Sequence, residues 1–200
     1  MLLREAQVVF LVERGFCLNF KITSYRPENL PESFRTQVID FMRCIWPHGF
    51  KNENQFRNWI HPESDHPLHF VMFHEETLIG HASVLWKKLV VGNEELKVYG
   101  LSGVMIYPNF QRMGLGLKLI QTATTHILMQ DGDLALLGCA PEIAELYAQA
   151  GWLSGNIQFT IGNPPQIETE TIFSKILSER GQNALRIQGQ VPIHFGDYGW

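Results

Sequence analysis

The stretch IYPNFQRMGLGLKLIQ, at residues 106–121, combines residue types that could bind phosphate. An apolar run ends near Pro108, and Gly114 and Gly116 then stand one residue apart before a segment with helical spacing. The start of a helix leaves backbone N–H groups without partners and carries partial positive charge, which suits a pyrophosphate. The glycines would let phosphate approach the backbone, and Arg112 could add a charge-assisted contact. The stretch therefore predicts a binding turn for a phosphate-bearing ligand.

Two familiar phosphate-binding loops do not match this turn. A dinucleotide fingerprint needs a third glycine, and a Walker loop needs Gly-Lys-Ser/Thr. The pattern is apolar–x–Pro–x–x–Gln/Arg–x–x–Gly–x–Gly, carried by Ile106, Pro108, Gln111, Gly114 and Gly116. It resembles the acetyl-CoA signature of the GNAT superfamily of N-acetyltransferases. The later stretch ELYAQAGWL, at residues 145–153, resembles that family's helix in which a tyrosine precedes a Gly-aromatic pair.

The resemblance implies a mixed α/β (α+β) GNAT fold, with a single, mostly antiparallel central sheet and helices on both faces. It implies acetyl-CoA as co-substrate, no metal, and direct attack by an amine. The backbone of Val104, Met105 and Ile106 would hold the thioester and pantetheine. Tyr147 would protonate the departing thiolate. The pyrophosphate would be bound by residues of the turn, namely Gln111, Arg112, Met113, Gly114, Leu115 and Gly116.

The acceptor is predicted to be a small molecule that carries a primary amine. Among GNAT enzymes the chain is most similar to aminoglycoside 2′-N-acetyltransferases, through LIGHASVLWKKLVV, GLSGVMI and a terminal tryptophan. That narrower resemblance implies that Asp197 and Trp200 lie near the acceptor. The general base stays open between Ser102 acting through water, His81 and the C-terminal carboxylate. Two alternatives are a longer acyl donor and a catalytically silent acyl-CoA-binding module.

The elements that must position these residues follow from hydrophobic spacing. We expect a helix over 32–45 after Pro31, a polar loop over 47–67, and a strand meander over 68–73, 78–91 and 96–107. Helices are expected over 114–130 and 141–151, with a buried strand at 134–138 between them. The segments 157–162 and 169–177 could form a further hairpin, although the second could also be helical.

The composition limits the classes of protein to which this chain could belong. The 200 residues are 45% hydrophobic with a net charge of −4, so no basic footprint for nucleic acid is present. Three dispersed cysteines do not suggest a disulfide framework. The apolar N-terminal patch is short and interrupted by charges, so we predict no membrane segment and a cytoplasmic protein. One domain is expected over 1–200, with a core over about 20–177, an arm over 1–19 and a tail over 178–200. A homodimer stays open.

Several polar residues have competing interpretations. His61, His66 and His69 could form a metal site, but a solvated loop is favoured because no second ligand cluster accompanies them. His81 could be a base, but a hydrogen-bonded core histidine is favoured. Cys139 is interpreted as a buried small hydrophobe rather than an acyl-enzyme nucleophile. Glycines within 100–103 predict a bulge or a close backbone approach.

Overall fold

The computed structural model describes residues 7–13, 16–91, 94–155, 157–167, 170–188 and 192–196. These residues belong to two compact units. The first unit comprises residues 1–83 and 103–119, and the second comprises residues 84–102 and 120–200. Each unit is described by itself below.

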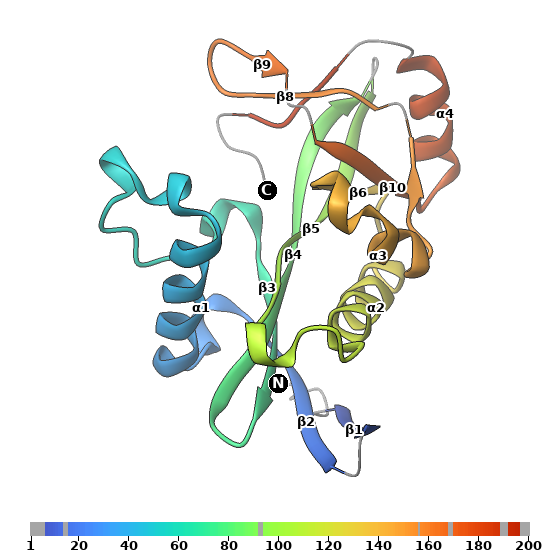
Figure 1. Cartoon of the computed structure of the whole chain (residues 1–200). Helices are drawn as coiled ribbons and strands as arrows, with labels where there is room; N and C mark the ends of the chain where they lie inside the picture. The colour runs from blue at the N-terminus through green and yellow to red at the C-terminus, as the bar shows by residue number, and fades with distance from the viewer. Residues whose placement is uncertain are drawn as a thin grey trace. The chain divides into compact units, whose positions relative to one another are not determined.

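Eight strands form the central sheet, in the order β1-β2-β3-β4-β5-β6-β10-β7 (Figure 1). Three short strands form a second sheet in the order β11-β8-β9. The strands of the central sheet are β1 (Gln7–Glu13), β2 (Phe16–Tyr25), β3 (Leu68–His74), β4 (Thr77–Val91), β5 (Glu94–Ile106), β6 (Leu134–Cys139), β7 (Leu153–Ser154) and β10 (Thr171–Ile176). Those of the second sheet are β8 (Phe159–Ile161), β9 (Gln166–Ile167) and β11 (Ile193–His194). The α-helices of the described chain are α1 (Glu32–Ile45), α2 (Leu115–Leu128), α3 (Ala144–Gln149) and α4 (Glu179–Gln188).

The expected fold class is confirmed as mixed α/β with a mostly antiparallel central sheet. The pairs β1–β2, β2–β3, β6–β10 and β10–β7 are antiparallel, whereas β5 and β6 are parallel. The helices expected over 32–45 and 114–130 and the strand expected over 134–138 are found within one or two residues. The small second sheet was not expected.

In the first unit, α1 packs its apolar face against the sheet. The helix begins directly after Pro31, and Phe34, Val38, Phe41 and Met42 recur on one face and are buried. Their core partners include residues of β3, β4 and β5, namely Val71, Leu78 and Met105. Figure 1 shows α1 lying beside β3. This core fixes the loop that follows α1, because Ile60 from that loop is part of it.

The second unit has its own core, and the C-terminal segment contributes to it. Ala184 of α4, Ile193 of β11 and Phe195 are buried with residues of β4, β5, β6 and β10. The rings of Phe159 and Phe195 meet edge to face at 5.3 Å. The described part of residues 178–200, which we had assigned to a tail, therefore includes a helix and a strand that join the core.

The hairpin expected between 157–162 and 169–177 is wrong. β8 pairs with β9 and β11, whereas β10 pairs with β6 and β7. The second segment is a strand rather than a helix, because Ile172 and Phe173 enter the core beside the buried strand β6. The apolar surface of β6 therefore determined where β10 pairs, and the closeness of β10 to β8 in the chain did not.

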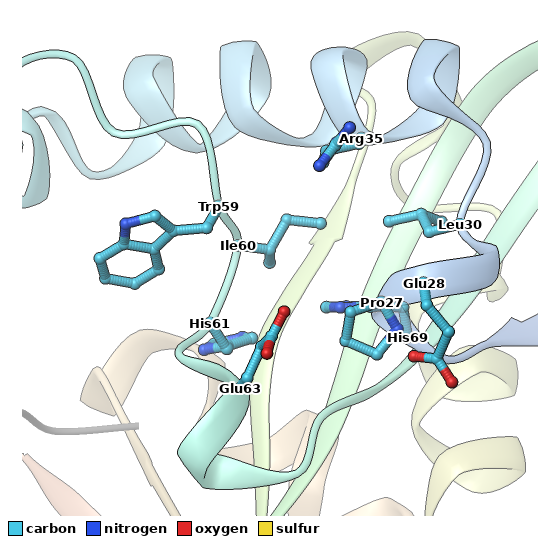
Figure 2. Close-up of a pocket in the computed structure, with 9 residues that line it drawn as sticks. All are labelled: Pro27, Glu28, Leu30, Arg35, Trp59, Ile60, His61, Glu63 and His69. Carbon is cyan, nitrogen blue, oxygen red and sulfur yellow. The ribbon is translucent and has the colours of Figure 1, made fainter.

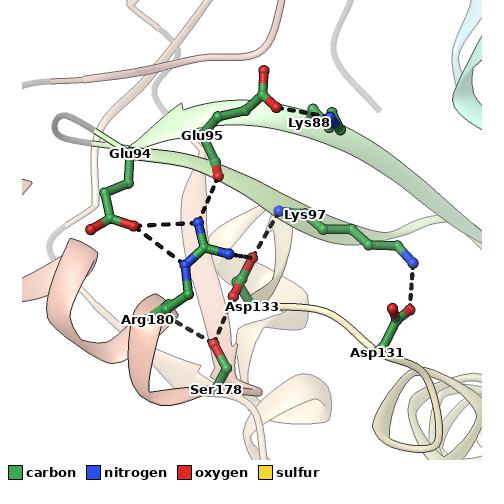
Figure 3. A network of polar contacts seen from close by, with 9 residues as sticks. Lys88, Glu94, Glu95, Lys97, Asp131, Asp133, Ser178 and Arg180 are labelled. Atoms are coloured by element: carbon green, nitrogen blue, oxygen red, sulfur yellow. Dashed lines mark hydrogen bonds and ion pairs between the residues drawn. The ribbon is translucent and has the colours of Figure 1, made fainter.

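A buried carboxylate joins three elements of the second unit (Figure 3). Asp133, directly before β6, accepts from the backbone N–H of Lys97 at 3.0 Å and from the Ser178 hydroxyl at 2.8 Å. Arg180 of α4 lies 3.5 Å from the same carboxylate. Gly181 is required here, because a Cβ would lie 2.0 Å from the Asp133 carbonyl oxygen. Asp133 thus joins β5, β6 and the start of α4.

We expect Asp133→Ala to lower the free energy of unfolding by about 3 kcal/mol, because it leaves several buried donors unsatisfied. The melting temperature should fall by roughly 6–12 °C for a chain of this size. Asp131→Asn is the matched control, because Asp131 contacts Lys97 from a fully exposed position. Equal melting temperatures for the two variants in differential scanning fluorimetry would contradict this role of Asp133.

Candidate active site

The predicted phosphate-binding turn forms a connection from β5 to α2 within the first unit. After β5 a short 3-10 helix (Pro108–Phe110) is closed by a bond from the Phe110 N–H to the Tyr107 carbonyl, at 2.8 Å. The Gln111 side-chain amide donates to the Ile106 carbonyl at 2.9 Å. The motif glutamine therefore anchors the turn to the end of β5.

The turn adopts the left-handed backbone that its glycine predicts. Arg112 has φ 62° and Gly114 has φ 73°. A Cβ on Gly114 would meet no heavy atom within 4 Å, so the backbone is open on that side. The N–H of Lys118 donates to the Gly114 carbonyl at 3.1 Å at the start of α2. The N–H groups of residues 115–117 come before this bond, in the first turn, where a helix has no carbonyl of its own to pair with them. The predicted residues Gln111 to Gly116 are thus brought together at the start of one helix.

The segment of β5 expected to hold the thioester has an irregular backbone. Gly103 has φ 57° within the strand, in agreement with the predicted bulge. Gly103 and Val104 are half-buried, whereas Met105 and Ile106 are buried. In the second unit, the parallel pairing of β5 with β6 ends at Gly100. Residues 101–102 and 137–139 continue their strands beyond that pairing.

Tyr147 lies on α3 in the second unit, after a 3-10 turn that begins at Pro141. Its side chain is buried and packs near the ring of Phe173, at 6.1 Å between centroids. Burial, together with Cys139 and Glu170 nearby, raises the pKa of Tyr147 above its ordinary value. The phenol is therefore protonated at neutral pH, as a proton donor must be. Ser102 is also buried in this unit, and among the described residues it makes no hydrogen bond with Tyr147.

Histidines form a buried cluster in the first unit, which corrects the expectation of a solvated loop. His69 is only 2% exposed on β3, and His61 is half-buried. His66 alone of the three is exposed. No group of three or more His, Cys, Asp or Glu side chains in the described parts of the chain is arranged to hold a metal ion.

His81 is a hydrogen-bonded core histidine, as favoured. Its Nδ1–H donates to the Gly103 carbonyl at 3.0 Å, and its Nε2 lies 3.2 Å from His69 Nδ1. Ser83 Oγ lies 3.0 Å from His69 Nδ1 and 3.3 Å from His81 Nε2. Burial lowers the pKa of His69 to about 3 and that of His81 to about 4, so both rings are neutral at physiological pH. Sequence reasoning missed this cluster, although His81 and Ser83 are two apart in a strand and therefore share a face.

A pocket of about 200 Å³ opens beside this cluster (Figure 2). Buried Leu30, Ile60 and His69 line it, together with His61. Glu28 and Glu63 are exposed residues of the lining, as is Trp59. Arg35 also lines the pocket and is paired with Glu32 on α1. The pocket thus has an apolar and imidazole interior with carboxylates at its edge.

Arginine contacts hold the loop that carries the pocket residues Trp59 to His61. The Arg57 guanidinium donates to the carbonyl of Trp59 at 2.8 Å and also to that of Ile60. It lies over the Trp59 ring, 4.1 Å from the centroid. These contacts fix the backbone directly before His61.

The remaining predicted acceptor residues, Asp197 and Trp200, lie outside the described residues. The helices of the described chain are all too short or too polar to cross a membrane.

Comparison with known proteins places this geometry in context. The sequence pattern of the acetyltransferase (GNAT) family matches residues 32–151. Among solved structures, NAA60 of Arabidopsis thaliana in complex with a bisubstrate analogue is 13% identical with a TM-score of 0.56, over 78% of this chain and 99% of that one. A GNAT family acetyltransferase from Brucella melitensis in complex with acetyl-CoA is 17% identical with a TM-score of 0.52, over 80% and 88%. FeeM, an N-acyl amino acid synthase from uncultured soil microbes, is 13% identical with a TM-score of 0.54, over 84% and 98%. At these identities the structures show a shared fold.

The two cysteines with described side chains should differ sharply in reactivity. Burial and Glu170 raise the pKa of the Cys139 thiol to about 11, whereas Cys44 is exposed. We expect iodoacetamide at pH 8 to alkylate Cys44 in the native protein and to leave Cys139 unmodified, because the thiolate is the nucleophile. Peptide mapping by mass spectrometry measures both sites in one sample. Rapid native alkylation of Cys139 would contradict its assignment as an inert core residue.

Proposed function

Because the chain belongs to the acetyltransferase (GNAT) family, we propose that it transfers an acetyl group from acetyl-CoA to a primary amine of a small molecule. The observation that carries the proposal is the turn from Gln111 to Gly116. Its left-handed residues, its open side at Gly114 and its position at the start of α2 suit a pyrophosphate. Arg112 supplies an exposed cation in the same turn.

The acyl arm of the donor would lie along β5. In this proposal the backbone of Val104, Met105 and Ile106 holds the pantetheine and the thioester carbonyl. A backbone N–H aimed at that carbonyl would stabilise the oxyanion that forms when the amine attacks. The Gln111 bond to the Ile106 carbonyl supports this arrangement, because it links the acyl segment directly to the pyrophosphate turn.

The neutral amine attacks the thioester carbon directly. A carbon–nitrogen bond forms, the carbon–sulfur bond breaks, and the thiolate of CoA takes the phenolic proton of Tyr147. Burial keeps the phenol of Tyr147 protonated at neutral pH, which a proton donor requires. Cys139 takes no covalent part, since its thiol is buried and protonated.

The acceptor would enter the pocket between Leu30, Ile60 and His69. Glu28 and Glu63 at its edge favour an amine that arrives as a cation. An aminoglycoside acceptor is the narrower form of the proposal. The residues on which that form rested, Asp197 and Trp200, are outside the described chain, so the broader amine class is the one we adopt.

The function is tested by calorimetry with acetyl-CoA and by release of free CoA thiol across a panel of primary amines. The panel includes alkyl and aryl monoamines, polyamines and aminoglycosides, and longer acyl-CoA donors are run in parallel. Binding and turnover with acetyl-CoA support the proposal. Binding without turnover for every amine and donor would overturn it in favour of a silent acyl-CoA-binding module.

Tyr147→Phe keeps the ring and removes only the proton donor. We expect kcat to fall about 100-fold, within the usual range for general acid catalysis, with the Kd for acetyl-CoA unchanged. Tyr99→Phe is the control, since Tyr99 is a buried tyrosine of the second unit whose ring lies near Lys97, and the variant should keep full activity. A Tyr147→Phe enzyme with the kcat of the wild type would show that another group protonates the thiolate.

Gln111→Ala removes the bond that anchors the turn and leaves the apolar core in place. We expect the affinity for acetyl-CoA to fall about tenfold, or about 1.4 kcal/mol, because the turn is no longer held in its binding geometry. Gln121→Ala, at an exposed position of α2, is the control. An unchanged Kd in calorimetry of the folded Gln111→Ala protein would show that the anchored turn does not contribute to the binding of acetyl-CoA.

A further inference from the structure

The hydrogen-bonded cluster in the first unit determines which nitrogen of each histidine carries the proton. The Gly103 carbonyl can only accept, so the Nδ1 of His81 is its proton-bearing nitrogen. His81 is fully buried and neutral, so its Nε2 has a lone pair and requires a donor.

The available donors for that lone pair fix the tautomer of His69. They are the Ser83 hydroxyl and His69 Nδ1, which also contact each other. If His69 Nδ1 carried no proton, a single hydroxyl proton would have to serve two buried imidazole lone pairs. If it carries the proton, His69 Nδ1–H donates to Ser83 and the Ser83 hydroxyl donates to His81, so the hydroxyl and the two nitrogens that face it are satisfied. An unsatisfied buried acceptor costs about 1–3 kcal/mol, so the second arrangement is favoured.

A neutral His69 with its proton on Nδ1 has a free lone pair on Nε2. His69 lines the pocket, where its ring stacks near that of His61 at 6.2 Å between centroids (Figure 2). The pocket also borders the proposed acyl segment. A Cβ on Gly103 would be 3.5 Å from His61 Nε2 and 3.5 Å from the His81 ring, and Val104 follows directly. A nitrogen without a proton therefore lies in the pocket, and His61 in the wall of the same pocket approaches the strand that would bind the thioester.

We propose that His69 Nε2 accepts the proton of the acceptor amine, and that Ser83, His81 and the Gly103 carbonyl hold His69 in the tautomer that makes this possible. This inference rests on the proposed function. The ammonium form of the acceptor first releases its extra proton to solvent, so that the neutral amine attacks. As the amine nitrogen bonds to the thioester carbon, one of its remaining N–H protons moves to His69 Nε2. The thiolate leaves with the proton of Tyr147. His69 then releases its proton to solvent through the pocket, and Tyr147 regains one.

The charged and titratable groups that share the pocket with His69 or contact it favour this transfer on balance. They are Glu28 from the 3-10 turn at Pro27–Asn29, Arg35 from α1, His61 and Glu63 from the loop, and His81 from β4. Neutral His69 does not repel a cationic amine, and the carboxylates at the edge stabilise the imidazolium that forms. Arg35 opposes this less than a free cation would, because it is paired with Glu32.

His69→Asn distinguishes the roles of the two ring nitrogens of His69. The asparagine amide can replace Nδ1–H as the donor to Ser83, whereas nothing replaces Nε2. We expect kcat to fall at least about 100-fold, as for loss of a general base, with the Kd for acetyl-CoA and the melting temperature unchanged. His66→Asn is the matched control, because His66 is exposed and has a left-handed backbone that asparagine tolerates. A folded His69→Asn enzyme with the kcat of the wild type would overturn the proposal.

The positioning role of Ser83 has a readout that does not depend on activity. Long-range 1H–15N NMR of imidazole-labelled protein reports the tautomer of His69 directly. We expect the Nδ1–H form in the wild type, and a mixed or reversed form in Ser83→Ala, with kcat about tenfold lower and restored by Ser83→Thr. A wild-type His69 in the Nε2–H form would overturn the proposal whatever the activity. The NMR result also holds if no amine is acetylated, so failure of this inference and failure of the proposed function are distinguishable.

The pH dependence of kcat/KM gives a second test of His69 as the proton acceptor. Because His69 is neutral across the physiological range, the acid limb of kcat/KM should follow ionisation of the amine used and should shift between amines of different pKa. An acid limb fixed near pH 6.5 for every amine would assign the proton to a histidine with an ordinary pKa, and so would contradict His69 as the acceptor.

Discussion

The left-handed backbone at Gly103 is the constraint on which the arrangement of the first unit depends. It lies within the continuous strand β5, at the boundary between the chain segments of the second and the first unit. A Cβ at this position would make ordinary contacts with the rings of His61 and His81, at 3.5 Å, so the left-handed φ rather than a lack of space favours glycine here. The Gly103 carbonyl then orients His81, and through it Ser83 and His69. One backbone conformation thus links the proposed acyl segment to the wall of the pocket.

The two units satisfy their buried polar groups in different ways. In the second unit a single carboxylate, Asp133, is surrounded by donors from the backbone, a hydroxyl and a guanidinium. In the first unit the buried cluster of His69, His81 and Ser83 consists of neutral rings and one hydroxyl, which share few protons. A network of neutral rings can exchange protons, and so is suited to chemistry.

The sequence was sufficient to predict the features that depend on residues close together in the chain. The turn from Gln111 to Gly116 and the helix after Pro31 depend on residues close together in the chain, and both were predicted. The partner of β10 was not, because strand pairing depends on the apolar surface of β6 about 35 residues earlier. The His69–His81–Ser83 cluster was also missed. It requires the register of two strands and the backbone of Gly103, neither of which spacing reveals. Likewise, the raised pKa of Tyr147 depends first on burial and then on Cys139 and Glu170, which lie outside its motif.

Each compact unit is assembled from two separate chain segments, with boundaries at residues 83/84, 102/103 and 119/120. The chain therefore cannot be cut at one peptide bond into two complete units. During synthesis the first unit stays incomplete until residue 119 has been made, although 83 of its residues precede the first boundary. Its early strands must wait for the end of β5 and the start of α2 before their core can close. The nascent chain therefore exposes apolar surface over that interval, and completion of the glycine turn marks the point at which this surface can be buried.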